Sequence, residues 1–106
     1  MTTLTLSAQA TDLVKAAFVS QRRLLDASRR EYRQRLEAVV RRYRMTTKRF
    51  VRRFHAGELG DDPAWFDWLF AHQAHTELLR RLAILRGIKM KRLGSAWIIG
   101  QVRKRL

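Results

Sequence analysis

The sequence of 106 residues contains no cysteine and one proline, and no glycine or proline occurs before Gly57. The absence of cysteine excludes disulfide bonds, cysteine-based zinc sites and a thiol nucleophile. No stretch approaches the ~18 consecutive apolar residues of a membrane-spanning helix. The first residues also lack the basic and apolar regions of a secretory signal peptide. We therefore expect a cytoplasmic protein with one modest core.

Acidic residues are also scarce, because nine Asp and Glu stand against 23 Lys and Arg, giving a formal net charge of +14. This balance predicts a polyanionic partner, which can be nucleic acid, an anionic lipid surface or an acidic protein. The alternative is that the many arginines reflect genomic composition. Residues 57–79 differ from the rest, since they carry five acidic and no basic side chains. That block can dock against the chain's own arginines or against those of a partner.

Strand signals are scarce, because the sequence shows no sustained alternation of apolar and polar residues and no Asn-Gly or Asp-Gly turn. We therefore predict an all-α protein. The first helix is expected from about Ser7 to Arg44, where apolar residues recur at the seven-residue spacing typical of coiled coils. The positions of this stripe are Leu4, Phe18, Leu25, Tyr32 and Val39, with Thr11 as its one polar interruption. Such a helix packs lengthwise against a helix of the same chain or of a second copy.

Two further helices have well-marked ends. Thr46 is the expected N-cap of a short helix from Thr47 to Ala56, and Gly57 is placed to end it. The Asp-Pro pair at 62–63 predicts the start of a third helix, which extends to about Arg86. The expected fold is an antiparallel hairpin of two long helices, with the short helix at its corner.

We expect residues 1–87 to form this helical hairpin domain and residues 88–106 to form a basic amphipathic tail. Ser95 is a candidate cap for a short helix in the tail that contains Trp97. Apolar residues before a basic end are typical of a membrane-surface anchor, but two glycines weaken this helix and we do not expect membrane binding. The exposed remainder of the heptad stripe predicts a homodimer or a helical protein partner.

The sequence offers little for catalysis or metal binding. His72 and His75 lie three residues apart, but no third ligand has a diagnostic spacing, so half-buried histidines are the simpler interpretation. Glu58, Asp61 and Asp62 lie between helices, where capping and the helix dipole explain carboxylates without an acid–base role. We therefore predict no enzyme, no catalytic residue, no metal site and no cofactor.

Basic clusters suit contacts with phosphates, which makes nucleic-acid binding the alternative function. The candidate phosphate-binding residues are Arg22, Arg29, Arg30, Arg41, Arg42, Arg49 and Arg53. The acidic start of the third helix argues against a recognition helix, because its carboxylates would face phosphates. The alternative is therefore binding without strong sequence specificity.

A more specific pattern lies between Tyr43 and Trp68, which reads YRMTTKRFVRRFHAGELGDDPAWFDW. It resembles a small all-helical prokaryotic family in which a long first helix ends in Tyr-Gly-Met-Ser/Thr. In that family a short helix with phenylalanine leads to Gly-Glu-Leu-Gly-Asp and then to a helix carrying Asp/Glu-Trp. The matching positions are Tyr43, Met45, Thr46, Phe50, Phe54, Gly57, Glu58, Leu59, Gly60, Asp61, Asp67 and Trp68. Arg44 departs from the pattern, which has glycine there.

The resemblance implies an antitoxin-like member of a toxin–antitoxin pair, which acts by direct protein contact. Our functional prediction is therefore a non-enzymatic interaction protein that binds a co-encoded toxin. The candidate partner-binding residues are Phe18, Leu25, Tyr32, Glu58, Asp61 and Trp97. The chain is far more basic than the resemblance leads us to expect, and nucleic-acid binding stays the alternative.

Overall fold

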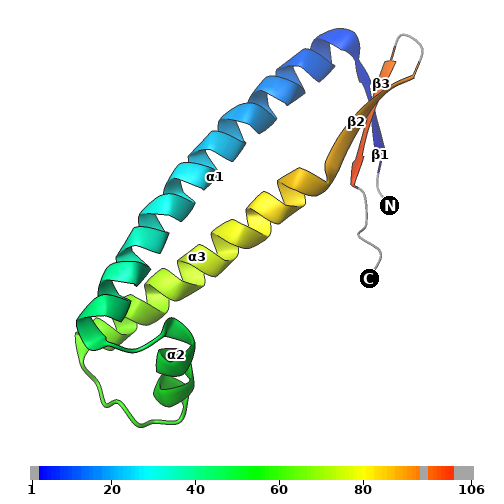
Figure 1. Cartoon of the computed structure of the whole chain (residues 1–106). Coiled ribbons are helices and arrows are strands. Elements are labelled where there is room, and N and C mark those ends of the chain that lie inside the picture. The colour runs from blue at the N-terminus through cyan, green and yellow to red at the C-terminus, as the bar shows by residue number, and fades with distance from the viewer. Residues whose placement is uncertain (1–2, 94–95, 102–106) are drawn as a thin grey trace. The chain divides into compact units, whose positions relative to one another are not determined.

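The computed structural model describes residues 3–93 and 96–101. In chain order they form strand β1 (Thr3–Ser7), helices α1 (Ala8–Tyr43), α2 (Thr47–His55) and α3 (Pro63–Gly87), and strands β2 (Ile88–Leu93) and β3 (Ala96–Gln101) (Figure 1). The chain divides into two compact units. Residues 27–79 form one, which we call the corner unit, and the described residues of 1–26 and 80–106 form the other, which we call the sheet unit.

The predicted hairpin of two long helices with a short helix between them is confirmed. In the corner unit, the ring of Tyr43 at the end of α1 lies 4.9 Å from Trp65 near the start of α3. Tyr32, an earlier residue of α1, lies 6.4 Å from the ring of Phe70, a later residue of α3. Because earlier residues of α1 meet later residues of α3, the two helices run antiparallel.

A stacked aromatic pair forms the core of the corner unit. Phe50 of α2 and Trp68 of α3 are 0% and 1% exposed, and their rings stack at 4.1 Å with an angle of 3° between the planes. Trp65 packs beside Phe50 at 5.9 Å, and Tyr43 lies 5.9 Å from Trp68. The indole Nε1 of Trp68 donates a hydrogen bond of 3.1 Å to the hydroxyl of Thr47. The buried indole therefore has the polar partner that it needs.

Side-chain caps begin both helices of the corner, as predicted. The Thr46 hydroxyl accepts a hydrogen bond of 3.2 Å from the backbone N–H of Arg49, in the first turn of α2. The carboxylate of Asp62 accepts a bond of 2.9 Å from the N–H of Ala64, in the first turn of α3. These caps supply acceptors for N–H groups that have no partner within the helix.

The end of α2 is a Schellman motif, again at the glycine that the sequence indicated. The N–H of Gly57 donates to the carbonyl of Phe54, and the N–H of Glu58 donates to the carbonyl of Arg53, both at 3.1 Å. The φ angle of Gly57 is 74°, in the left-handed region that this motif requires. Glycine reaches this region without the steric penalty of a side chain.

Arg44, which follows α1, has a φ angle of 52°. Among the described residues other than glycine, it is the one with a positive φ. The resembled family has glycine at this position, and the backbone conformation gives a physical reason for that preference. An L-residue in the left-handed region costs about 1–2 kcal/mol through contact between its Cβ and the backbone.

In the sheet unit, the polar break in the heptad stripe of α1 is Thr11, which bonds to Ser7, the residue that caps the start of the helix. The hydroxyl of Thr11 donates a bond of 2.8 Å to the carbonyl of Ser7, and the N–H of Ala10 donates to the Ser7 hydroxyl at 3.2 Å. Thr11 is 0% exposed, and among the residues of this unit whose burial the structure describes, the buried apolar ones are Leu25 and Leu82. The stripe of α1 therefore faces the interior of its own chain.

The three strands form one antiparallel sheet in the order β1-β3-β2. The central strand pairs Trp97 with Leu6 of β1 and Ala96 with Leu93 of β2. Strand β3, which we expected to belong to a tail, therefore pairs with the start of the chain, and β2 pairs with the other side of β3. The basic residues 103–105 lie outside the described residues.

The predicted short helix in the tail is wrong, because residues 96–101 form a strand; its expected cap, Ser95, lies outside the described residues. These residues form a strand because one edge of β3 pairs through backbone hydrogen bonds with β1, which lies at the opposite end of the chain. Local signals existed as well. Thr and Leu alternate over 3–6, apolar residues and Lys alternate over 88–91, and β-branched Ile98 and Ile99 favour a strand.

We predict that Thr47→Val destabilises the protein by about 1–3 kcal/mol, because it keeps the side-chain volume but leaves the buried Trp68 N–H without its acceptor. Thr76→Val is the matched control, since that hydroxyl bonds the carbonyl of His72 at an exposed position. Urea unfolding followed by tryptophan fluorescence measures both. Equal losses for the two variants would contradict the importance of the indole bond.

We predict that Arg44→Gly stabilises the protein by about 0.5–1 kcal/mol, because relief of left-handed strain exceeds the extra entropy of glycine in the unfolded chain. Arg41→Gly, at an exposed position inside α1, should change stability by a similar amount in the opposite direction. Thermal unfolding by circular dichroism gives both values. The prediction is wrong if Arg44→Gly lowers the melting temperature as Arg41→Gly does.

Candidate functional site

A groove of about 450 Å³ opens on the corner unit between the C-terminal part of α1 and the N-terminal part of α3. Its apolar lining consists of Ala38, Val39, Tyr43, Ala64, Trp68, Phe70 and Ala71. Three charged residues complete it: Arg35 and Arg42 from α1, and Asp67 from α3. A concave, mostly apolar surface with a few charged groups is the usual form of a binding site. We call this surface the α1–α3 groove.

Aromatic rings hold the two arginines of the groove. The guanidinium of Arg35 lies 5.0 Å from the ring of Tyr32 and donates a bond of 2.6 Å to Glu31. The guanidinium of Arg42 lies 5.4 Å from the ring of Tyr43. An exposed ion pair adds less than about 1 kcal/mol, so these contacts orient the side chains more than they stabilise the fold. The α1 side of the groove therefore carries cations at defined positions.

Two exposed phenylalanines extend the apolar surface. Phe70, which lines the groove, is 62% exposed, and Phe66 is 52% exposed. They lie four residues apart on α3 and so share one face of the helix. Phe66 contacts Phe54 edge to face at 5.5 Å, and Phe70 contacts Tyr32 in the same way. Single exposed apolar residues are common, but two adjacent rings beside an apolar groove indicate an interaction surface.

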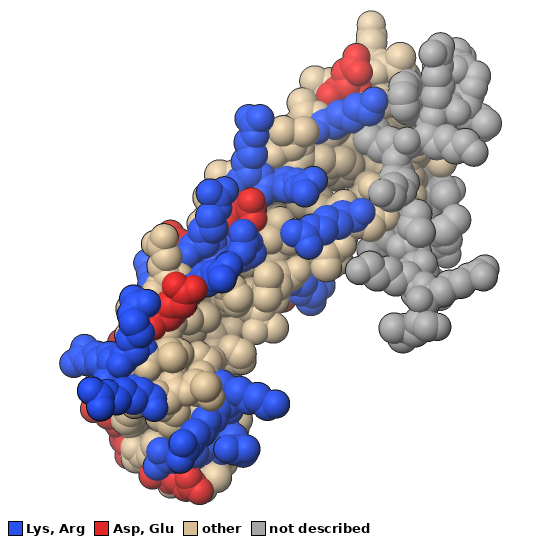
Figure 2. All heavy atoms as spheres, in the orientation of Figure 1, with Lys and Arg blue, Asp and Glu red and all other residues tan. Residues whose placement is uncertain are grey.

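A second depression, of about 430 Å³, lies on α2 and its C-terminal turn. It is lined by Arg49, Arg52, Arg53, Ala56 and Glu58, and we call it the α2 basic pocket. Figure 2 shows that Lys and Arg side chains gather along α1 and around α2. Within the part of the chain that the structure describes, neither Arg49 nor Arg52 forms an ion pair, so both guanidinium groups have donors available.

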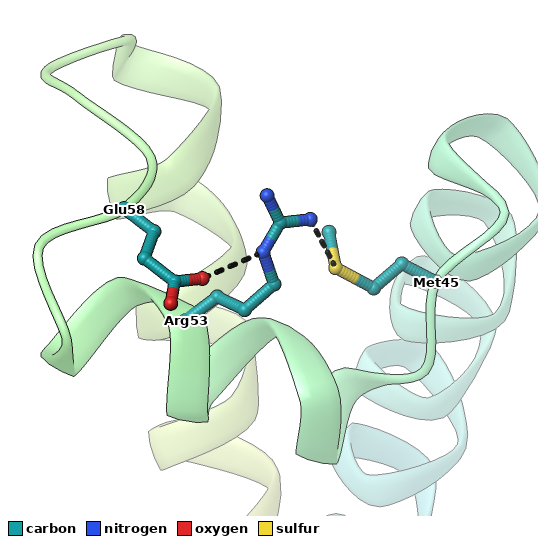
Figure 3. Close-up of polar contacts among 3 residues, drawn as sticks. All are labelled: Met45, Arg53 and Glu58. Atoms are coloured by element: carbon teal, nitrogen blue, oxygen red, sulfur yellow. Dashed lines mark hydrogen bonds and ion pairs between the residues drawn. The ribbon is translucent and has the colours of Figure 1, made fainter.

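Arg53 is held from two sides (Figure 3). Its Nε donates a bond of 3.1 Å to the carboxylate of Glu58, and one terminal nitrogen lies 3.8 Å from the sulfur of Met45. The ion pair joins the same two residues as the last backbone bond of the Schellman motif. Glu58 therefore has a partner within its own chain, and it offsets one positive charge of the pocket.

The structure places the predicted partner-binding residues in different surroundings. Leu25 is buried at 6% exposure, and Phe18 and Tyr32 are half-buried on the interior face of α1. Asp61 is exposed in the connection between α2 and α3. Trp97 belongs to β3 through its backbone, while its side chain lies outside the described part of the structure. Of these residues, Tyr32 is the one in ring contact with the surface at Phe70.

The predicted phosphate-binding arginines likewise lie on several different surfaces. Arg49 and Arg53 line the α2 basic pocket, and Arg42 lines the α1–α3 groove. Arg41 lines a further depression with Thr47 at the start of α2. Arg22, Arg29 and Arg30 lie elsewhere on α1, and Arg22 is part of the sheet unit.

Sequence reasoning missed three residues of these surfaces. Neither Phe66 nor Phe70 is among the candidate partner-binding residues, and Arg52 is not among the candidate phosphate-binding residues. The positions of these residues relative to Trp68 and Arg49 on their helices are the signals that could have identified them. Phe66 and Phe70 each lie two residues from buried Trp68, which places them roughly 200° around the helix from it. Arg52 lies three residues after Arg49 and so shares its face.

Among the described residues, no group of three His, Asp or Glu side chains is arranged to hold a metal ion. None of the helices in residues 3–93 is both long enough and apolar enough to cross a membrane. The histidines have different surroundings: His55 is exposed, whereas Nε2 of His75 is buried without a hydrogen-bond partner.

A scan against protein-family models found no match, and searches of the curated proteins and the solved structures also found none. The resemblance of residues 43–68 to an antitoxin-like family therefore stays a prediction. The argument for function depends on the two surfaces of the corner unit.

Burial lowers the pKa of His75 below 6.5, and the positive charge of Arg29, then His72 and Arg33, lowers it further. Protonation therefore favours the unfolded chain. The stability of the folded state is unaffected above pH 6.5 and falls as the pH drops through the interval between that unfolded-state pKa and the lower folded-state pKa.

We predict that His75→Leu makes stability less dependent on pH between about 7.5 and 5, because it removes this proton-linked loss. His55→Gln, which replaces an exposed histidine, should retain the wild-type pH dependence. Urea midpoints measured at several pH values test the difference. Parallel curves for the wild type and His75→Leu would show that burial of this histidine has no energetic effect.

Proposed function

We propose that this protein is a non-enzymatic, antitoxin-like interaction protein that binds the product of a neighbouring gene. The observation that supports the proposal best is the exposed pair Phe66 and Phe70 beside the α1–α3 groove. Burying two such rings provides the kind of central aromatic contact that dominates protein–protein affinity. The resemblance of residues 43–68 to antitoxin-like proteins favours the same function.

The chemistry of the groove defines the partner segment. An apolar floor between two helices suits an amphipathic helix that inserts side chains at spacings of three and four residues. Arg35 and Arg42 would face acidic residues at the edge of that helix, and Asp67 would limit acidic contacts on the α3 side. We therefore propose an amphipathic helix with an acidic edge as the bound segment of the partner.

The groove is well suited to tight binding because it is held by a rigid frame. Its walls carry Tyr43 and Trp68, which belong to the aromatic core, and α3 begins at the Asp62 cap. A surface that is already ordered loses little conformational entropy when a partner binds. We expect the backbone of the corner unit to change little between the free and bound forms.

We predict that Phe70→Asp weakens binding to the neighbouring gene product by about 30-fold or more, because it places a charge where an aromatic ring should be buried. Leu24→Asp is the matched control, since Leu24 is 66% exposed on α1 but does not line the groove. Co-purification followed by calorimetry measures both affinities, and rescue of growth during toxin expression measures function.

Absence of a complex with the wild-type protein, together with absence of growth rescue, would overturn the proposed function. Equal weakening by Phe70→Asp and Leu24→Asp would leave a complex but reject the groove as its site. Thermal unfolding of each variant shows whether a loss of binding is a loss of folding.

A further inference from the structure

Helix α2 has two faces with different roles. Phe50 is fully buried against α3, and Phe54 contacts Phe66, so the apolar face belongs to the core of the corner unit. Lys48, Arg49 and Arg52 are exposed, and their spacing of three and four residues places them together on the opposite face. The fold therefore orients a row of cations outward.

The surroundings of this face contain very few acidic groups. Residues 38–57 include seven basic and no acidic side chains. Glu58 is the carboxylate that lines the α2 basic pocket, and Arg53 already neutralises it through the 3.1 Å ion pair. Arg49 and Arg52 therefore retain an excess of positive charge at the pocket, and within the described residues neither has an ion-pair partner.

Guanidinium groups suit one class of ligand in particular. Each presents five N–H donors in a planar fork that matches the oxygens of a phosphate. The pocket, of about 430 Å³, is large enough for a phosphate group with its attached sugar oxygens. Lys48 lies on the same face and can contact a neighbouring phosphate as a point charge.

We propose that the α2 basic pocket binds the phosphate backbone of nucleic acid, with Arg49 and Arg52 donating to one phosphate and Lys48 to the next. The pocket contains no aromatic or amide side chain to stack on bases or to read their edges, so binding is independent of sequence. This site is separate from the α1–α3 groove, because none of its residues lines that groove, and it does not require the partner protein.

An anionic membrane presents similar phosphate chemistry, but the packing of α2 argues against it. A basic amphipathic helix binds a membrane by inserting its apolar face among the lipids. Here that face is occupied, since Phe50 is 0% exposed and stacks on Trp68. The basic face alone offers charge without an apolar anchor, which favours a charged polymer over a lipid surface.

The test uses the full chain, a fluorescent 20-nucleotide single strand and a duplex, each in two unrelated sequences. We expect the wild type to bind all of them at low salt, with affinity that falls steeply as salt rises. The variant Arg49→Glu/Arg52→Glu should weaken binding by about tenfold or more and make the logarithmic salt slope shallower by about 1–2, because phosphate contacts are lost.

The matched control is Arg23→Glu/Arg86→Glu, which changes the net charge equally at exposed helical positions in the sheet unit that are not among the candidate phosphate-binding residues. We expect this control to bind within about threefold of the wild type, because direct phosphate contacts outweigh net charge at moderate salt. The variant Arg49→Gln/Arg52→Gln, which avoids new carboxylates, should also weaken binding. Melting curves confirm that each variant is folded.

Three outcomes would overturn the proposal. The first is absence of nucleic-acid binding at low salt. The second is an equal loss in the α2 variant and in the Arg23→Glu/Arg86→Glu control, which would assign binding to net charge. The third is stronger binding to vesicles containing phosphatidylserine than to nucleic acid. Because Phe70→Asp should leave nucleic-acid binding unchanged, failure of this site and failure of the proposed protein partner are distinguishable.

Discussion

The stacking of Phe50 on Trp68 is the contact on which the corner unit depends. It joins α2 to α3 at 4.1 Å with nearly parallel rings, and the indole bond to Thr47 fixes the start of α2 against the same residue. This pairing determines how α2 is rotated about its axis. Because the apolar face is turned to α3, Lys48, Arg49 and Arg52 are turned to solvent.

The same aromatic residues also explain why a groove exists beside the core. Tyr43 and Trp68 stack on each other between α1 and α3, and the small residues Ala38, Ala64 and Ala71 line the groove beside them. Small side chains between large ones leave a depression whose floor is apolar. Phe70 then stands at its edge, 62% exposed.

Two carboxylates of the acidic connection between α2 and α3 have structural roles. Asp62 caps α3, and Glu58 pairs with Arg53 across the Schellman motif. The sequence predicted the first role, because Asp before Pro is a local signal of a helix start. It did not predict the second, because an ion pair between two side chains depends on how the turn at Gly57 brings them together.

The helices, their caps and the turn at Gly57 could be predicted from local sequence signals, because they depend on interactions within a few residues of the chain. Which apolar residues of these helices are exposed depends instead on how the helices pack against one another. Leu25 and Phe66 are both apolar helical residues, yet packing buries the first and exposes the second. The tertiary structure also decided that residues 96–101 form a strand, because their hydrogen-bonding partner β1 lies at the other end of the chain.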